Sequence, residues 1–191
     1  MNALVNKFPT KFKIDNVEYH INTDFRNCLN IILAFEDENL TQVEKIEIML
    51  ILLYGEGSIP PKAEKAIELA LKFLDCGEAN NKIDNNEERV TQRYYSFEKD
   101  SKYIYSAIKQ THNIDLEKIE YLHWWKFVYM FLDLDKECFF SQLMYLRQQK
   151  SKGKLSKEEK QYYMSIREIA DLDYTNEASD EENEFLELLK K

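Results

Sequence analysis

In the first 22 residues, polar and apolar positions alternate. In the chain that follows, apolar residues recur instead every three or four positions. Residues 11–14 and 17–21 flank Asp15-Asn16, and two alternating stretches around a two-residue turn of this type predict a β-hairpin. Because an isolated hairpin is only marginally stable in water, we expect it to pack on the body of the protein.

Three amphipathic helices are predicted next, from apolar residues that recur every three or four positions. Thr23 or Asp24 can cap the first helix, and a T-x-x-E capping box that begins at Thr41 opens the second. Pro60-Pro61 suit the first turn of the third helix, and Gly77 suits a left-handed residue at its end. The short connections favour antiparallel packing of these helices.

The following part of the chain is rich in aromatic residues. It predicts a helix over 98–112 that stops at Asn113, and a second helix that Asp115 caps and that runs to Leu132. This second helix is apolar around most of its circumference, as is typical of a helix covered on several sides. We therefore expect the centre of the core here. The expected core residues are Phe25, Tyr103, Leu122, Trp124, Trp125, Phe127 and Phe131.

Two more helices are predicted, over 136–149 and after a second capping box that begins at Ser156. The expected fold is thus mainly α: a compact bundle of about six to seven helices with a short N-terminal β-hairpin. The pattern divides the chain into an N-terminal hairpin (1–22), a first helical half (23–77), a flexible polar loop (78–93), a second, aromatic-rich helical half (94–172) and an acidic, largely disordered tail (173–191).

Charge is distributed unevenly along the chain. Acidic residues outnumber basic ones by 35 to 26, which gives a formal net charge of −9. Residues 171–191 hold eight acidic and two basic residues, so the rest of the chain has a net charge of only −3. An acidic protein repels phosphate backbones, and we do not expect general nucleic-acid binding.

No catalytic motif accompanies these helices, and no motif for a nucleotide or another cofactor is found. His123 follows Glu120 by three positions, so the two side chains are predicted to share a helix face. E-x-x-H is a di-iron ligand spacing, but such a site needs two of these motifs and two further carboxylates. We therefore expect no metal site, and a core hydrogen bond for His123.

The three cysteines, Cys28, Cys76 and Cys138, are far apart and form no CxxC pair, which favours free thiols in a reducing compartment. The chain begins without the apolar core of a signal peptide. Its longest apolar run, 48–54, is too short for the roughly 20 residues that cross a bilayer. We expect a cytosolic protein that does not enter the membrane.

A basic cluster precedes Tyr162-Tyr163 and allows three interpretations. Basic residues interleaved with aromatic ones can bind single-stranded nucleic acid, a solvated loop can have the same composition, and the cluster can instead dock the chain's own acidic tail. Its members are Arg147, Lys150, Lys152, Lys154, Lys157 and Lys160.

Phe185, Leu188 and Leu189 follow the acidic run at helical spacing. This pattern is typical of a segment that folds when it docks into a groove, and we take these three residues as candidate partner-binding residues. The alternative is a frayed end with apolar residues that occur there by chance.

Several sequence blocks resemble the "gene product fifteen" family of phages and prophages of Gram-positive bacteria. The blocks are Asp24-Phe25-Arg26, Ser96-Phe97-Glu98-Lys99-Asp100, Leu122-His123-Trp124-Trp125-Lys126-Phe127 and Tyr145-Leu146-Arg147. The resemblance covers about residues 10–173, and the third block is its most specific part.

The resemblance implies a role in tail assembly, because genes of this family lie just before the tape-measure gene. It implies a non-enzymatic tail assembly chaperone in the host cytoplasm that binds the tape-measure protein and other phage tail proteins and that can associate with itself. It implies no cofactor and no small-molecule substrate. A structural tail or connector component that stays in the virion is an open alternative. An enzyme that uses His123 and nearby carboxylates is a second one, although no set of nucleophile, base and orienting group can be assembled.

Overall fold

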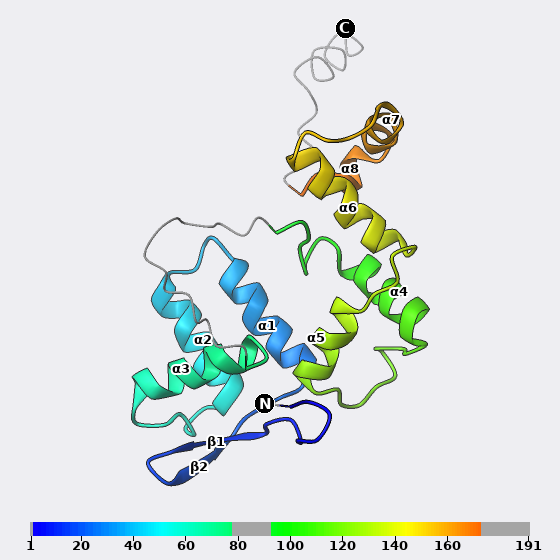
Figure 1. Cartoon of the computed structure of the whole chain (residues 1–191). Coiled ribbons are helices and arrows are strands. Elements are labelled where there is room, and N and C mark those ends of the chain that lie inside the picture. Colours follow the sequence, from blue (N-terminus) through cyan, green and yellow to red (C-terminus); the bar gives the residue numbers. More distant parts are fainter. Residues whose placement is uncertain (1, 78–92, 173–191) are drawn as a thin grey trace, which may run out of the picture.

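The computed structural model describes residues 2–77 and 93–172 (Figure 1). Within these ranges the chain forms two strands and eight helices, which confirms a mainly α fold with a short N-terminal hairpin. The predicted polar loop lies outside the described residues except for Arg93, and the acidic tail over 173–191 lies wholly outside them.

The hairpin consists of β1 (Lys11–Ile14) and β2 (Val17–His20), which pair antiparallel. Asp15 and Asn16 connect them with φ angles of 49° and 66°. Positive φ at both central residues defines a type I′ turn, whose twist matches that of the strands, so the Asx-Asx turn predicted from the sequence is present.

The hairpin is held against the helices by apolar contacts. The ring of Phe12 meets those of Tyr54 and Phe73 edge-on, each at a centroid distance of 6.0 Å. Ile14 and Ile21 are buried in the main core. The hairpin therefore gains from the helical body the burial that two strands lack by themselves.

Three neighbouring helices follow: α1 (Phe25–Glu36), α2 (Gln42–Tyr54) and α3 (Ala63–Leu74). Asp24 caps α1, since its carboxylate accepts a hydrogen bond from the backbone of the second helical residue. Thr41 forms the predicted capping box at the start of α2. α1 packs on α2 and α2 on α3, as the short connections predicted (Figure 1).

The second half begins with α4 (Ser101–His112), which ends at left-handed Asn113 as predicted. The next helix, α5, covers Trp124–Leu132. The prediction that this helix starts at Asp115 is therefore wrong over its first eight residues, 116–123, which lie before α5.

The late start of α5 has a cause in distant backbone pairing. Asp24 and His123 form an antiparallel bridge. The amide of Phe25 donates to the carbonyl of Leu122 at 2.9 Å, and the amide of Trp124 donates to the carbonyl of Thr23 at 2.7 Å. The residues before α1 and α5 thus satisfy each other's backbone groups in an extended conformation, which a helix through this region would exclude.

The last three helices are α6 (Phe139–Ser151), α7 (Lys157–Ser165) and α8 (Arg167–Ala170). The predicted capping box at Ser156 opens α7. The single final helix of the prediction is broken at Ile166, whose φ and ψ of −116° and 22° are not helical. This break gives eight helices in the described ranges where six to seven were predicted.

Helices α6, α7 and α8, here called the arm, extend away from α1, α2 and α3 (Figure 1). The main core joins the hairpin, α1 to α5 and the first turn of α6. A second, smaller core lies within the arm, and its buried members are Leu143, Leu146, Tyr163 and Ala170.

Six of the seven expected core residues are buried: Phe25, Leu122, Trp124, Trp125, Phe127 and Phe131. Tyr103 is only partly buried, and its ring packs on that of Phe139 at a centroid distance of 5.0 Å. In the described residues, none of the helices has the length and apolar character needed to cross a membrane.

Candidate functional site

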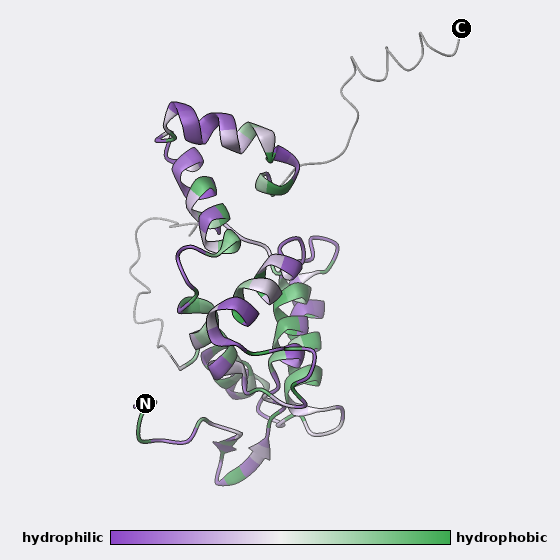
Figure 2. Ribbon diagram, turned by 90° about the vertical axis from the view of Figure 1, so that its right-hand side faces the viewer, coloured by the Kyte–Doolittle hydropathy of each residue, from purple (hydrophilic) through white to green (hydrophobic). Residues whose placement is uncertain are grey.

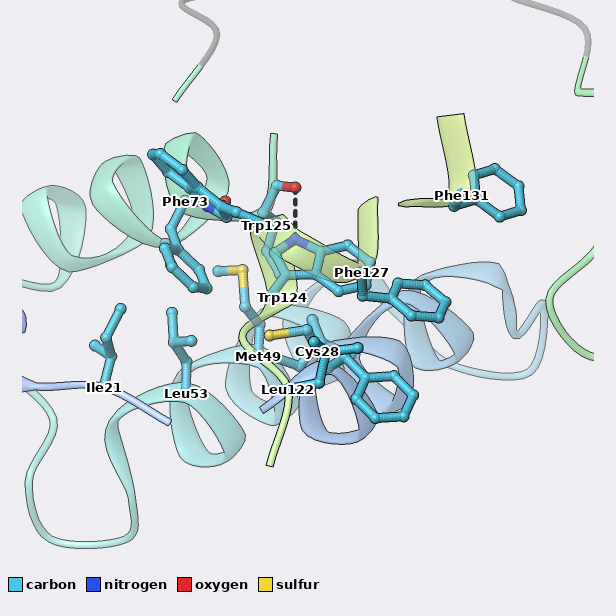
Figure 3. Close-up of a cluster of buried hydrophobic side chains, with 14 of the residues drawn as sticks. Ile21, Cys28, Met49, Leu53, Phe73, Leu122, Trp124, Trp125, Phe127 and Phe131 are labelled. Atoms are coloured by element: carbon cyan, nitrogen blue, oxygen red, sulfur yellow. Dashed lines mark hydrogen bonds between the residues drawn. The ribbon is translucent and has the colours of Figure 1, made fainter. Parts of the chain in front are cut away.

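Two adjacent tryptophans of α5 form hydrogen bonds with the end of α3. The indole nitrogen of Trp124 donates to the carbonyl of Leu74 at 2.9 Å, and that of Trp125 donates to the carbonyl of Phe73 at 2.8 Å (Figure 3). These carbonyls belong to the last turn of α3 and have no partner within the helix. Both indoles therefore stabilise the fold from inside.

Gly77 lies directly against this pair. Its φ is +78°, and a Cβ atom at this position would be 2.9 Å from Cη2 of Trp125. The backbone here needs both a left-handed conformation and the absence of a side chain, which only glycine supplies.

A chain of stacked rings continues from the tryptophans along α5. Phe127 stacks on Phe25 of α1 at 4.9 Å and on Trp124 at 5.7 Å. Phe131, one turn further, meets Phe140 of α6 at 5.7 Å and Tyr95 at 5.1 Å. The rings join α1, α5, α6 and the segment before α4 into one apolar layer.

One side of this layer opens into a groove, here called the apolar groove. Two adjoining cavities of about 350 and 340 Å³ form it, and they share Ile32, Leu74, Asp75 and Arg93. Leu74, Trp124, Phe127 and Phe131 are its buried members. Its accessible apolar walls are Ile32 and Phe35 of α1, Leu71 of α3, and Val128, Tyr129 and Leu132 of α5.

The walls of the groove remain exposed to solvent to an unusual degree. Leu132 is 74% exposed and Leu71 is 42% exposed, although both are large aliphatic residues. Exposed apolar residues that line one depression mark interaction surfaces more often than residues scattered singly over a protein.

The rim of the groove carries a few charged groups. Arg93 forms an ion pair with Glu36, and its guanidinium lies over the ring of Tyr95 at 5.7 Å from the centroid. Burial raises the pKa of Glu36, while the charge of Arg93 acts in the opposite direction. An apolar interior with a small charged rim can bind the apolar face of a helix and orient it.

His123 is used as a structural residue at the start of α5. Its Nδ1 accepts a hydrogen bond from the amide of Trp125 at 3.1 Å, and Nε2 lies 3.0 Å from the carbonyl oxygen of Pro9. The neutral ring with a proton on Nε2 satisfies both contacts. Burial lowers the pKa of His123, and the hydrogen bond to Pro9 opposes this effect.

The prediction that Glu120 and His123 share a helix face is wrong, because Glu120 precedes α5 and His123 is its N-cap. Among the residues that the structure describes, no three His, Cys, Asp or Glu side chains converge in a way that could hold a metal ion. The expected core hydrogen bond of His123 is present.

One predicted member of the basic cluster, Arg147, lies in the interior of the protein. Arg147 is buried, and its guanidinium donates to both carboxylate oxygens of Asp100, at 2.6 and 2.9 Å. It also donates to the carbonyls of Tyr94, Ile169 and Ala170. Every N–H of Arg147 thus points at a protein acceptor, and this side chain is not available to a ligand.

The other five members of the basic cluster lie on the surface. Lys150 forms an ion pair with Asp171 and a hydrogen bond with the hydroxyl of Tyr163. Within the described residues, Lys152, Lys154, Lys157 and Lys160 have no ion-pair partner and are exposed. These four residues are here called the arm lysines. Lys152 and Lys154 lie in the loop after α6, and Lys157 and Lys160 lie at the start of α7.

The candidate partner-binding residues Phe185, Leu188 and Leu189 lie outside the described residues. Sequence reasoning did not find the apolar groove, because its walls come from α1, α3 and α5, which are far apart in the sequence. The only signal in the sequence was the high apolar content of the Trp124–Leu132 stretch. An ordinary core helix has the same composition, so this signal does not identify a groove.

Comparison with known proteins gives one match. A family model described as "Bacteriophage Gp15 protein" matches residues 4–172. No curated protein and no solved structure gives a significant match. The matched range includes the hairpin, all eight described helices and the apolar groove, and it ends where the acidic tail begins.

Proposed function

The chain belongs to the bacteriophage Gp15 family, a family of phage structural and tail-region proteins, and on this premise we propose that it acts as a tail assembly chaperone for the tape-measure protein. It acts by non-covalent binding in the host cytoplasm, where phage particles are assembled. The observation that carries this proposal is the apolar groove, whose exposed walls are suited to another polypeptide.

The groove has the properties that a helical ligand requires. It is lined on both sides by helices, and apolar residues reach from its buried floor to its exposed edge at Leu132. A helix that lays its apolar face into such a groove removes that face from water, at about 25 cal/mol for each Å² buried.

A tape-measure protein is a long and largely helical chain whose apolar faces need cover until the tail tube surrounds it. Several copies of a small protein with one groove each can bind along such a chain. Even a weak single contact is then sufficient, because neighbouring sites on one ligand raise the effective concentration. The acidic tail, through Phe185, Leu188 and Leu189, adds a second contact in this proposal.

Co-expression with the adjacent tape-measure gene product tests the proposal. We expect the tape measure to stay soluble and to co-purify with the wild-type chain. Leu132→Asp places a charge on the exposed wall of the groove and should reduce the recovered tape measure about tenfold, the equivalent of 1.4 kcal/mol.

Val43→Asp is the matched control. Val43 is 65% exposed on α2 and does not line the groove, so this variant should retain wild-type recovery. Both variants should keep the wild-type unfolding curve. An insoluble tape measure, or equal recovery with both variants, would contradict the proposed role of the groove.

Mass spectrometry of purified virions separates the chaperone from a structural component that stays in the particle. A chaperone leaves the finished tail, so we expect the chain to be absent from virions or present only in traces. Many copies per particle would support the structural alternative.

A further inference from the structure

The point where the chain leaves the described structure is fixed on the basic side of the arm. The carboxylate of Asp171 accepts hydrogen bonds from Tyr163 at 2.6 Å and from Arg167 at 3.0 Å, and it forms an ion pair with Lys150. The chain therefore starts its acidic tail next to the end of α6.

The same end is held by Arg147, which donates to the carbonyls of Ile169 and Ala170 at 2.8 Å each. These carbonyls belong to α8, whose last groups have no partner within the helix. Side-chain and backbone contacts together hold residues 169–171, just before the tail, next to α6.

Exposed lysines that have no ion-pair partner among the described residues lie on α7 and in the loop before it. Lys157 and Lys160 lie three positions apart on α7, and Met164 is four positions further, so all three project from one face of the helix. Met164 is 58% exposed. Figure 2 shows the arm, at the top of the view, with mainly hydrophilic residues on its outer helix and few hydrophobic ones.

The composition of the tail complements this face. Residues 173–191 contain seven acidic and two basic residues, and the acidic ones are interspersed with Phe185, Leu188 and Leu189. Glu181 and Glu184 are three positions apart in the sequence, which is also the spacing of Lys157 and Lys160 on α7. The tail thus offers carboxylates to the arm lysines and apolar side chains to Met164.

We propose that the outer face of α7, together with the preceding loop, is a binding surface for acidic amphipathic segments and that residues 173–191 of the same chain occupy it. The tether at Asp171 keeps the tail at high effective concentration near the arm lysines, so weak contacts are sufficient. The bound tail neutralises the arm lysines and competes with any acidic segment of another protein. This docking goes beyond the proposed chaperone role and does not depend on it. The tail contact proposed above for the tape-measure protein forms only when the tail leaves the arm.

Zero-length cross-linking of the full chain with a carbodiimide tests the docking, because the reagent joins a carboxylate to an amine only when they are in contact. We expect the tail carboxylates to link to the arm lysines several-fold more often than to Lys13 or Lys72, which are exposed elsewhere. Raising the salt from about 0.05 M to about 0.5 M should reduce these links several-fold, since it shortens the screening length. An even distribution over all exposed lysines would overturn the proposal.

A mixture of unlabelled and ¹⁵N-labelled chains distinguishes the tail's own arm from that of a second copy. Links within one chain support the proposal, and links found only between chains overturn it in favour of self-association. As a matched pair, K157E/K160E should lower the yield of links from the tail to Lys152 and Lys154 several-fold, and K13E/K72E should leave that yield unchanged. Circular dichroism checks the fold of both variants, and the wild-type distribution decides the question if either fails to fold.

Discussion

Arg147 and Asp100 form a buried ion pair that joins α6 to the start of α4, with side-chain exposures of 5% and 1%. Asp100 also accepts a hydrogen bond from the amide of Ser96 at 3.0 Å. The pair thereby connects the segment before α4, the middle of the arm and the carbonyls at the end of α8. It is a buried polar link between the arm and the rest of the protein.

Arg147→Leu should lower the free energy of unfolding by about 3–5 kcal/mol, because it leaves the carboxylate of Asp100 buried without a counter-charge. Urea denaturation measures the change. Removal of both groups in D100L/R147L should cost less than the sum of the single changes, since no unpaired charge remains. Lys65→Ala breaks the exposed pair with Glu68 and should change stability by less than about 1 kcal/mol.

Gly77→Ala should destabilise the protein by more than the 1–2 kcal/mol or so that a left-handed conformation costs a residue with a side chain. The added Cβ also meets Trp125, so the junction of α3 and α5 has to shift. Gly57→Ala is the control, because Gly57 has nearly the same φ, +79°, with nothing within 4 Å of a Cβ atom. Equal losses in the two variants would show that contact with Trp125 does not matter.

The stability of the protein should depend on the protonation of His123. Burial lowers its pKa in the folded state, so the unfolded chain binds the proton more tightly. The stabilisation by neutral His123 is complete above the unfolded pKa of about 6.5, declines as the pH falls below that value and reaches its minimum below the folded pKa. Urea midpoints between pH 8 and pH 5 measure this decline.

His123→Asn retains an N-cap acceptor but cannot titrate, and it should flatten the pH profile in this window. A profile that stays steep in the His123 variant would mean that another group is responsible.

Asp171 should stabilise the arm down to strongly acidic pH. Burial raises its pKa, but hydrogen bonds from Lys150, Tyr163 and Arg167 outweigh this effect and lower the pKa to about 2. Its contribution is therefore present above the unfolded value of about 3.9 and is lost as the pH falls towards 2. Asp171→Asn should remove it at neutral pH, with a loss of about 1–2 kcal/mol in urea denaturation.

Local signals in the sequence were reliable where the structure depends on neighbouring residues. Both capping boxes, at Thr41 and Ser156, and the left-handed end at Asn113 are where the pattern indicated them. Each depends on groups within a few positions of one another, so the sequence contains the complete interaction.

Interactions between distant residues were not accessible to the same reasoning. Residues 119–122 have apolar spacing that fits a helix, yet the chain is not helical there, because the carbonyl of Leu122 accepts a hydrogen bond from the residue after Asp24. Arg147 looked like a surface cation, because nothing near it in the sequence indicates Asp100 as its partner. The apolar groove was missed for the same reason.

The bridge between Asp24 and His123 also has a consequence for the order of events during synthesis. A ribosome adds about 5–20 residues per second, so about 5–20 s separate the translation of these two residues. Until residues 122–124 emerge, the amide of Phe25 and the carbonyl of Thr23 lack their backbone partners, and Phe25 lacks the ring of Phe127 on which it stacks. The amino-terminal helices therefore cannot reach their final state before this later part of the chain emerges, and until then their apolar sides stay accessible to cellular folding factors.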